Sequence, residues 1–366
     1  MKIIIVGTRG IPARYGGFET CAEKLSIGLV KRGHKVFVTC RKYLYPEKLK
    51  VYKGVNLVYL PSLKNKFTDT FSHTFFSILW AIFKNPDIIL VFNSANSPLC
   101  ILPRILGKKI VINVDGLEWK RRKWGFFGKI YYRFCEFFSC LIANRIIADS
   151  KEIKNYYKNK FGKEPIYIPY GADFEILENE EIMKKYGIEK FNYFFNGSRL
   201  EPENNQDLIV KSFLKVNTQK KLIIIGKASY KSKYEKRLKM IKDKRIKFIE
   251  PIYSPDYNVI MANCYAYIHG NEVGGTNPAL LKAMGSGKCI LAIDVPFNRE
   301  VLGDCGFYFK KDTNDLKEKI EFLLRNPYIV EEFGKKARER AKKLYKWEDV
   351  VESYEKLFLE LAWEKK

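Results

Sequence analysis

The sequence predicts an α/β protein made of two doubly wound, Rossmann-like domains. Short β-rich apolar runs alternate with helical patterns from the first residue onward. Runs that are apolar on both faces are typical of parallel sheets covered by helices. The alternation pauses once near the middle of the chain and then restarts, and a length of 366 residues exceeds the usual size of one globular unit. These observations favour two domains of the same class.

Seven predicted strands lie in the first half of the chain. They are Lys2–Val6, Lys35–Cys40, Val55–Leu60, Ile88–Phe92, Ile110–Val114, Ile146–Ala148 and Ile166–Ile168. Between the first two, residues 21–30 carry apolar side chains at helical spacing, and Gly33 follows as a stop signal. The chain is therefore expected to open with a β-α-β unit.

The pause falls at residues 170–173 and in the acidic segment 175–181, and six predicted strands follow it. They are Tyr193–Phe195, Leu222–Ile225, Ile246–Ile249, Ala266–Ile268, Cys289–Ala292 and Phe307–Phe309. The tail, residues 312–366, is predicted to be helical. We expect an N-terminal domain over 1–172, a C-terminal domain over 173–345 and a last helix over 346–366 that returns to the N-terminal domain. Two such domains facing each other across a cleft would place the carboxyl ends of their strands at a shared ligand site.

The composition excludes several classes of protein. A hydrophobic fraction of 46% with 15% aromatic residues excludes a disordered chain. The longest apolar stretch, Phe71 to Phe83, is shorter than the roughly 20 residues of a membrane-spanning helix. The first residues run into a glycine turn without a cleavage site, so we expect a strand there and a cytosolic protein. Eight cysteines without a Cys-x-x-Cys pair and three scattered histidines predict reduced thiols and no metal site.

The positive charge is concentrated in one half of the chain. Residues 1–172 hold 30 Lys plus Arg against 11 Asp plus Glu, a net charge of +19, whereas residues 173–366 hold 36 against 30, a net charge of +6. This imbalance predicts an anionic partner for the N-terminal half: nucleic acid, acidic membrane or a phosphorylated substrate.

A glycine pair stands at a helix start after the first predicted strand. Gly16 and Gly17 follow Arg9 and Arg14, and backbone N–H groups at such a start bind anions along the positive end of the helix dipole. The spacing is not the Gly-x-Gly-x-x-Gly of a dinucleotide site, and the second strand ends without the acidic residue that would hold a ribose. A nicotinamide cofactor is therefore disfavoured.

Two carboxylates and a basic aromatic segment follow the fifth predicted strand. Asp115 and Glu118 lie just past its carboxyl end, where they would accept hydrogen bonds from sugar hydroxyls or a proton from a nucleophile. Lys120–Lys123 then precedes a stretch rich in Trp, Phe and Tyr up to residue 138. Such a stretch suits the headgroup boundary of an anionic membrane, or equally a helix that packs its aromatic residues into the core.

Two loops in the second half have the composition of a phosphate site. Arg199 follows the first strand there, and its guanidinium would bind a diphosphate. After a later strand, Gly274, Gly275 and Thr276 precede Asn277-Pro278, a good N-cap followed by a good first helical residue. Free N–H groups at that helix start are expected to cradle phosphate oxygens.

With these motifs in place, the layout resembles a GT-B glycosyltransferase of the large retaining family 4, and five blocks resemble its rhamnosyltransferase-type subgroup. The blocks are Gly7–Thr20, Asn113–Trp124, Pro169–Asp173, Arg199–Asn205 and Gly274–Met284. The resemblance spans essentially the full chain. It implies a nucleotide sugar bound by the C-terminal domain and an acceptor bound by the N-terminal domain. Similar members build bacterial capsule or cell-wall polysaccharide on a lipid pyrophosphate carrier.

The sequence departs from the family pattern at two places. The general pattern has Glu at each end of a seven-residue gap, the second Glu holding the nucleotide ribose. Here these positions are Gly274, which the subgroup shares, and Lys282, which it usually does not. Either Glu272 replaces the carboxylate, or the ribose is held differently, or activity is reduced. The Lys that commonly follows the Arg is also missing, and Asn204 and Asn205 stand near its place.

The resemblance and the motifs together predict a cytosolic enzyme, peripherally associated with the inner face of the cell membrane. It would move a sugar, rhamnose as the first choice, from a dTDP- or UDP-sugar to a lipid-linked saccharide in capsule, O-antigen or cell-wall polysaccharide synthesis. No Asp-x-Asp occurs, so no metal is expected to neutralise the leaving diphosphate. The alternatives are a nucleotide-sugar epimerase or hydrolase of the same fold and, favoured only by the net charge of +25, a nucleic-acid-binding protein.

The predicted site residues fall into three groups. The catalytic candidates are Arg199, Asp115 and Glu118. The nucleotide-sugar candidates are Gly16, Gly17, Arg199, Asn204, Gly226, Glu272, Gly274, Gly275, Thr276, Asn277 and Lys282. The acceptor candidates are Arg9, Arg14, Tyr15, Glu19, Trp119, Lys120 and Arg121.

Overall fold

The protein was analysed as a computed structural model, which describes residues 1–14, 16–65, 68–114, 116–122, 124–228, 232–253 and 255–364. The chain divides into two units. The first consists of Met1–Gly171 and Trp347–Lys366, and the second of Ala172–Lys346. The chain therefore passes between the units twice.

The first unit is built on a mainly parallel sheet. Its strands are β1 (Lys2–Val6), β2 (Lys35–Arg41), β3 (Val51–Tyr52), β4 (Val55–Leu60), β5 (Ile88–Phe92), β6 (Ile110–Asn113), β7 (Arg145–Ala148) and β8 (Ile166–Tyr167). Their order is β3-β4-β2-β1-β5-β6-β7-β8, and β3 pairs antiparallel with β4. The seven predicted strands are confirmed. The sequence did not predict β3, because two residues are too short to show a periodic pattern.

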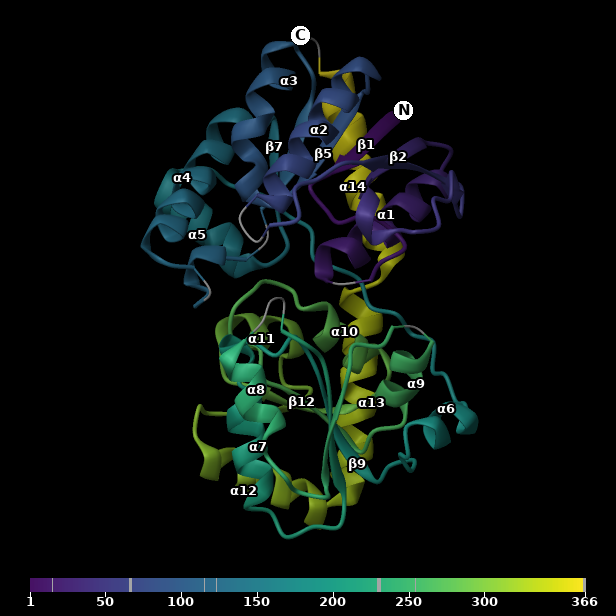
Figure 1. Cartoon of the computed structure of the whole chain (residues 1–366), viewed down its shortest axis with the longest axis vertical. Coiled ribbons are helices and arrows are strands. Elements are labelled where there is room, and N and C mark those ends of the chain that lie inside the picture. Colours follow the sequence, from purple (N-terminus) through teal and green to yellow (C-terminus); the bar gives the residue numbers. More distant parts are fainter. Residues whose placement is uncertain are drawn as a thin grey trace. The chain divides into compact units, whose positions relative to one another are not determined.

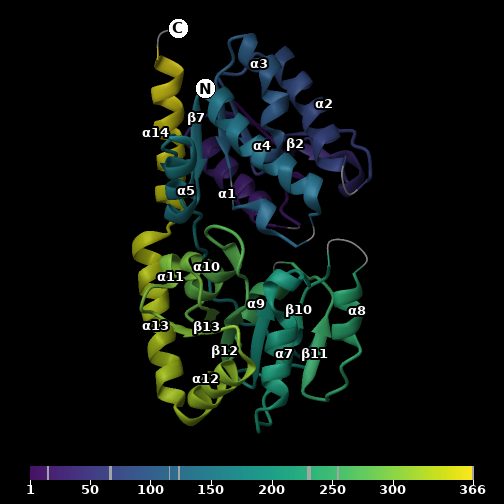
Figure 2. The same cartoon turned by 90° about the vertical axis from the view of Figure 1, so that its left-hand side faces the viewer.

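Helices cover this sheet on both faces (Figure 1; Figure 2). They are α1 (Gly17–Lys31), α2 (Asp69–Phe83), α3 (Ile101–Ile105), α4 (Phe126–Ile142), α5 (Lys151–Phe161) and α14 (Trp347–Trp363), with 3-10 segments η1 (Lys42–Leu44), η2 (Ser94–Cys100) and η3 (Glu118–Lys120). The segment η2 contacts α2, α3 and α4, and α1 contacts α14. Figure 2 shows the first group and the α1–α14 pair on different sides of the strands.

The last helix, α14, is bound to the first unit by specific contacts. The Asn113 amide at the end of β6 donates to the hydroxyl of buried Tyr354 at 2.8 Å. At the surface, Glu355 pairs with Arg32 at 2.7 Å and with the His34 ring at 2.6 Å. Gly28 of α1 lies so close to Val351 that a Cβ at this glycine would be 2.5 Å from a Val351 methyl group. These contacts attach the C-terminal segment to α1 and β6.

The second unit is built on a parallel sheet with the order β11-β10-β9-β12-β13-β14. Its strands are β9 (Tyr193–Gly197), β10 (Lys221–Ile225), β11 (Ile246–Ile249), β12 (Ala266–His269), β13 (Cys289–Ile293) and β14 (Phe307–Phe309). Its helices are α6 (Glu180–Lys185), α7 (Gln206–Leu214), α8 (Lys233–Lys239), α9 (Asp256–Ala262), α10 (Pro278–Gly285), α11 (Pro296–Leu302), α12 (Thr313–Arg325) and α13 (Pro327–Leu344), with η4 (Pro202–Asn204). The six predicted strands and the helical tail are confirmed.

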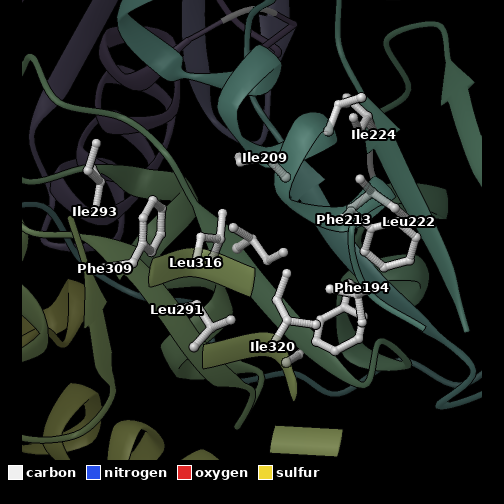
Figure 3. Close-up of a cluster of buried hydrophobic side chains, with 14 of the residues drawn as sticks. Phe194, Ile209, Phe213, Leu222, Ile224, Leu291, Ile293, Phe309, Leu316 and Ile320 are labelled. Carbon is white, nitrogen blue, oxygen red and sulfur yellow. The ribbon is translucent and has the colours of Figure 1, made fainter. Parts of the chain in front are cut away.

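One hydrophobic core cluster of the second unit lies between the sheet and the helices α7 and α12. Figure 3 shows Phe194 and Ile224 of the sheet facing Ile209 and Phe213 of α7 and Ile320 of α12. Because these strands are buried on both faces, their apolar runs are nearly continuous, which is the pattern that made them predictable.

Two negative findings concern the described part of the chain. No helix in it is both long and apolar enough to span a membrane. All eight cysteines are free thiols, and seven of them are buried.

Candidate functional site

The candidate nucleotide site of the second unit is the carboxyl edge of its sheet. The strands β10, β9 and β12 are adjacent and parallel, so the loops that follow them emerge at the same edge. Backbone hydrogen bonds connect these loops: the Leu200 N–H donates to the Lys227 carbonyl at 3.2 Å, and the Glu272 N–H donates to the Glu203 carbonyl at 3.1 Å. The three loops therefore form one surface.

Arg199 lies in the first of these loops. Its backbone carbonyl accepts hydrogen bonds from the Asn204 amide at 2.7 Å and the Gln206 amide at 2.8 Å, and both of these side chains are buried. The Arg199 side chain is half-buried, and no described side chain forms an ion pair with its guanidinium. The loop is thus held rigid through its backbone, while the guanidinium keeps its hydrogen-bond donors for a ligand.

Two glycines let the loops approach each other closely. A Cβ at Gly226 would lie 1.9 Å from the Ser198 carbonyl oxygen, and a Cβ at Gly270 would lie 2.4 Å from the Asn204 carbonyl oxygen. Neither position has room for a side chain. Gly226 therefore contributes to the candidate site by permitting the Arg199 loop to pack against β10.

The third loop ends at the start of α10. Gly274 has φ +153°, which strains an L side chain even though the space around its Cβ position is open. Glycine adopts this backbone conformation without strain, and a Glu at this position, as in the general family pattern, would be strained in it. Gly275 and Thr276 are buried, and the Asn277 side chain accepts from the Ala279 N–H at 2.9 Å. The predicted cap, with Pro278 at the first helical position, is confirmed.

The two charged candidates near this loop each have a protein partner. The Glu272 carboxylate accepts from Lys311 Nζ at 2.7 and 2.8 Å. Lys282, on α10, donates to the Asn258 side-chain oxygen at 2.9 Å, and its Nζ lies 5.3 Å from the Tyr257 ring centroid. An ammonium group cannot accept a hydrogen bond, so Lys282 cannot hold a ribose hydroxyl as a carboxylate would.

Sequence reasoning missed two buried polar residues at this edge. The Gln206 amide, besides its bond to Arg199, donates to Ser198 Oγ at 2.7 Å. His269, the last residue of β12, is fully buried, and burial lowers its pKa to about 3, so its ring is neutral. No sequence signal distinguished Gln206 from an exposed helix residue. His269 could have been noticed, because it ends a strand directly before a glycine-rich loop.

In the first unit, the predicted anion site at the start of α1 contains a carboxylate. Glu19 is buried in the first turn of α1, and its Oε1 accepts from the Arg9 N–H at 2.9 Å. A Cβ at Gly16, the residue before the helix, would lie 3.1 Å from Glu19 Oε2. Gly17 is the first helical residue. A bound phosphate near these glycines would meet this negative charge, so diphosphate binding is better supported at the second unit.

The other candidates of the first unit contact nearby groups. The exposed Arg14 guanidinium lies 5.2 Å from the Tyr45 ring centroid and donates to the Leu44 carbonyl at 3.3 Å. Glu118 forms an ion pair with buried Arg121. The pair links Glu118 of η3 to the residue that follows this segment.

Trp119 and Lys120 follow Glu118 in η3. The Trp119 ring is covered by the Arg133 guanidinium at 4.4 Å from the ring centroid, whereas Lys120 is exposed. Tyr15, Asp115 and Lys123 lie outside the described residues.

The aromatic part of the basic aromatic segment, from Phe126 onward, lies in helix α4, and most of its aromatic residues point outward. Phe126 and Phe127 are 73% and 84% exposed, and Tyr131, Phe134 and Phe137 are also exposed. The buried face consists of Tyr132, Cys135, Glu136, Ser139 and Cys140. The alternative of a helix packing its aromatic residues into the core therefore applies to Tyr132 and not to the exposed positions.

The described residues contain no group of three His, Cys, Asp or Glu side chains that could hold a metal ion. At the carboxyl edge of the second sheet, the Arg199 guanidinium and the start of α10 are arranged to meet an anion.

Several known proteins are similar to this chain. An uncharacterised glycosyltransferase of Methanocaldococcus jannaschii is 24% identical over 321 residues, which cover 85% of this chain and 86% of that protein. A sucrose-phosphate synthase of Thermosynechococcus elongatus has a similar structure, with a TM-score of 0.81, 16% identity and 98% of each chain covered. The structure of Anabaena HepE in complex with UDP-glucose matches with a TM-score of 0.77, 15% identity and coverage of 98% of this chain and 100% of that one. At these identities the structural matches establish the fold alone.

Two family models match the two halves of the sequence. Residues 15–175 match the family described as Glycosyltransferase Family 4, and residues 178–343 match the family described as Glycosyl transferases group 1. Together with the two parallel α/β sheets and the structural matches, these findings show that the chain is a glycosyltransferase of the GT-B fold, with a family 4 domain in its N-terminal part and a group 1 domain in its C-terminal part.

Proposed function

We propose that this glycosyltransferase transfers a sugar, with rhamnose as the first choice, from a nucleoside diphosphate sugar to a lipid-linked saccharide acceptor. The structure of the Arg199 loop is the main support for a nucleoside diphosphate sugar as the donor. A rigid backbone presents a guanidinium without a described ion-pair partner at the same sheet edge as the start of α10. A diphosphate is the ligand that fits a guanidinium and a helix N-terminus together. The UDP-glucose complex of the similar Anabaena protein supports the same class of donor.

The proposed reaction breaks the bond between the sugar anomeric carbon and the diphosphate oxygen and forms a bond from that carbon to the acceptor hydroxyl oxygen. Negative charge grows on the leaving diphosphate, where Arg199 and the Gly274–Asn277 segment stabilise it without a metal. In the retaining mechanism implied by the family resemblance, the acceptor proton passes to the leaving phosphate on the same face of the sugar. Asp115 and Glu118 remain candidates for orienting the substrates.

The proposed acceptor is a saccharide on a lipid pyrophosphate, in capsule, O-antigen or cell-wall polysaccharide synthesis. Support comes from the positive charge of residues 1–172 and from the exposed aromatic residues of α4, which suit an anionic membrane. We therefore place the enzyme at the inner face of the cell membrane as a peripheral protein. The acceptor is proposed to lie on the first unit, among Arg9, Arg14 and the segment 119–121.

Donor binding tests the proposal directly. Thermal unfolding should be measured with a panel of nucleoside diphosphates and their sugars, since a ligand at 100 times its dissociation constant adds about 2.7 kcal/mol to stability. Stabilisation by dTDP- or UDP-sugars, together with transfer to a lipid-linked saccharide, is expected. Cleavage of the donor that is equally fast without acceptor would favour the hydrolase alternative, and the absence of any nucleotide effect would contradict the proposal.

The nucleotide preference depends on Lys282. The Lys282 ammonium donates to Asn258 and cannot accept from a ribose 2′ hydroxyl, and the nearby Glu272 carboxylate is already paired with Lys311. We expect deoxythymidine diphosphate to bind no worse than uridine diphosphate, and Lys282→Glu to shift the preference toward the ribonucleotide. Calorimetric titration of both nucleotides into both proteins measures this. A wild-type preference for uridine diphosphate above tenfold, about 1.4 kcal/mol, would show that another group accepts from the ribose.

A further inference from the structure

Three helices on one side of the first unit present apolar side chains to the outside. α2, α3 with its C-cap Leu106, and α4 carry 15 of the 27 large hydrophobic residues that are exposed in the described part of the chain. They include Phe75, Phe83, Ile105, Phe126, Phe127 and Leu141. Because η2 contacts all three helices, they form one continuous layer, which Figure 2 shows on one side of the strands. We call this layer the apolar helix face.

The composition of α2 shows that this exposure is not incidental. Between Asp69 and Lys84 the helix contains no charged residue. Its inner side buries Thr74, Ser77, Ile78 and Ala81, while Phe83 on the outer side is 85% exposed. A surface helix normally presents polar side chains to water and apolar ones to the core, and α2 has apolar residues on both sides. Large exposed apolar patches are typical of surfaces that bind a membrane or another molecule.

The charges on the apolar helix face determine what covers it. Lys84, Arg104, Lys129 and Arg133 are exposed on these helices or at their ends. The acidic residues of the three helices, Asp69 and Glu136, are both buried. A second copy of the same face would bring like charges together, which is unfavourable. Anionic lipid headgroups, in contrast, attract the cations while the acyl chains accept the apolar side chains.

We infer that the apolar helix face is an insertion surface for an anionic phospholipid bilayer, in which α2 and α3 enter the headgroup–acyl boundary together with α4. This inference rests on the proposed function for its biological setting and deepens it. The proposed membrane contact through residues 120–123 and α4 is extended to two helices that the sequence analysis did not assign to a membrane surface. Insertion of apolar side chains, unlike attraction between surface charges, resists salt.

The test is sedimentation of the full chain with phosphatidylglycerol-containing vesicles, without nucleotide or acceptor. The variant Phe75→Gln/Phe83→Gln/Ile105→Gln removes three outward side chains. Met240→Gln/Tyr328→Gln is the matched control, because these residues are 75% and 67% exposed on the second unit. The wild type and the control should remain bound at about 1 M NaCl, where the screening length is about 3 Å. The triple variant should bind the vesicles at least about tenfold more weakly than the wild type. Its thermal unfolding in solution should be unchanged.

A charge variant separates the two contributions. Arg104→Gln/Lys129→Gln should weaken the preference for anionic over neutral phosphatidylcholine vesicles, because two of the four exposed cations remain, while keeping the salt-resistant part of binding. Equal vesicle binding by the wild type and the triple variant would overturn the inference. So would a wild-type dimer that the triple variant converts to a monomer, or retention on mixed oligonucleotides in place of vesicles. Nucleotide binding in solution does not depend on this face, so a failure of the proposed function is recognised separately.

Discussion

At the scale of single residues, Arg199 is the side chain on which the proposed chemistry depends most. Its backbone is held by Asn204 and Gln206, so replacing its side chain should leave the loop in place. Arg199→Ala is expected to lower turnover by about 100- to 1000-fold, because a preorganised charge at the leaving group contributes about 2.7–4 kcal/mol in the transition state. Arg299→Ala is the matched control, since Arg299 is exposed and pairs with Asp294. Turnover of the Arg199 variant at the wild-type level would contradict the assignment.

At the same scale, the buried His269 ring leads to a prediction about how the stability of the protein depends on pH. Burial lowers its pKa to about 3, below the ordinary value of about 6.5, so the unfolded chain binds a proton there that the folded chain does not. The contribution of His269 to stability is therefore complete above about pH 6.5 and is lost as the pH falls toward 3.

Unfolding of the wild type and His269→Leu should be compared by calorimetry near pH 7 and pH 5. Between these values the wild type should lose about 2 kcal/mol more than the variant, because only the wild type has this proton to take up on unfolding. Parallel pH profiles of the two proteins would show that the ring is not neutral in the folded state.

At the scale of elements, the contact between α1 and α14 depends on a glycine. Gly28→Ala improves helix propensity by about 1 kcal/mol, but the new Cβ would lie 2.5 Å from a methyl group of buried, β-branched Val351. Overpacking of this kind costs about 1–3 kcal/mol, so we expect net destabilisation.

Denaturant unfolding of Gly28→Ala, Val351→Ala and the double variant measures this coupling. The double variant should be more stable than the sum of the two single effects predicts, because shortening the Val351 side chain would give the new methyl group room. Additive effects would mean that α14 moves away from α1 freely, and hence that the close approach is not required.

At the scale of the whole molecule, the proposal that transfer needs no metal ion is testable. The proposed stabilisation of the leaving diphosphate uses the Arg199 guanidinium and the start of α10. Turnover should therefore be unchanged after treatment with EDTA. Activity that is lost in EDTA and restored by magnesium or manganese would show that a metal ion neutralises the diphosphate instead.

The fold and several site elements could be predicted from the sequence because their signals are local. Strands buried on both faces have continuous apolar runs, so each of the 13 predicted strands is present, with ends shifted by two residues at most. The start of α10 was predictable for the same reason, because an N-cap, a proline and the preceding glycines are neighbours in the chain.

Only the tertiary structure decided which partners the charged residues have and which apolar side chains of α2 face outward. Glu272 and Lys311 are 39 positions apart, and the burial of Glu19 follows from its bond to the Arg9 loop. No local pattern encodes such pairs, because they depend on which loops the sheet order brings together. On α2, apolar residues on both sides hid which side faces the core. The sequence by itself thus determined two parallel α/β sheets and the loops after their strands, while packing determined which charges are already paired and which apolar side chains remain exposed.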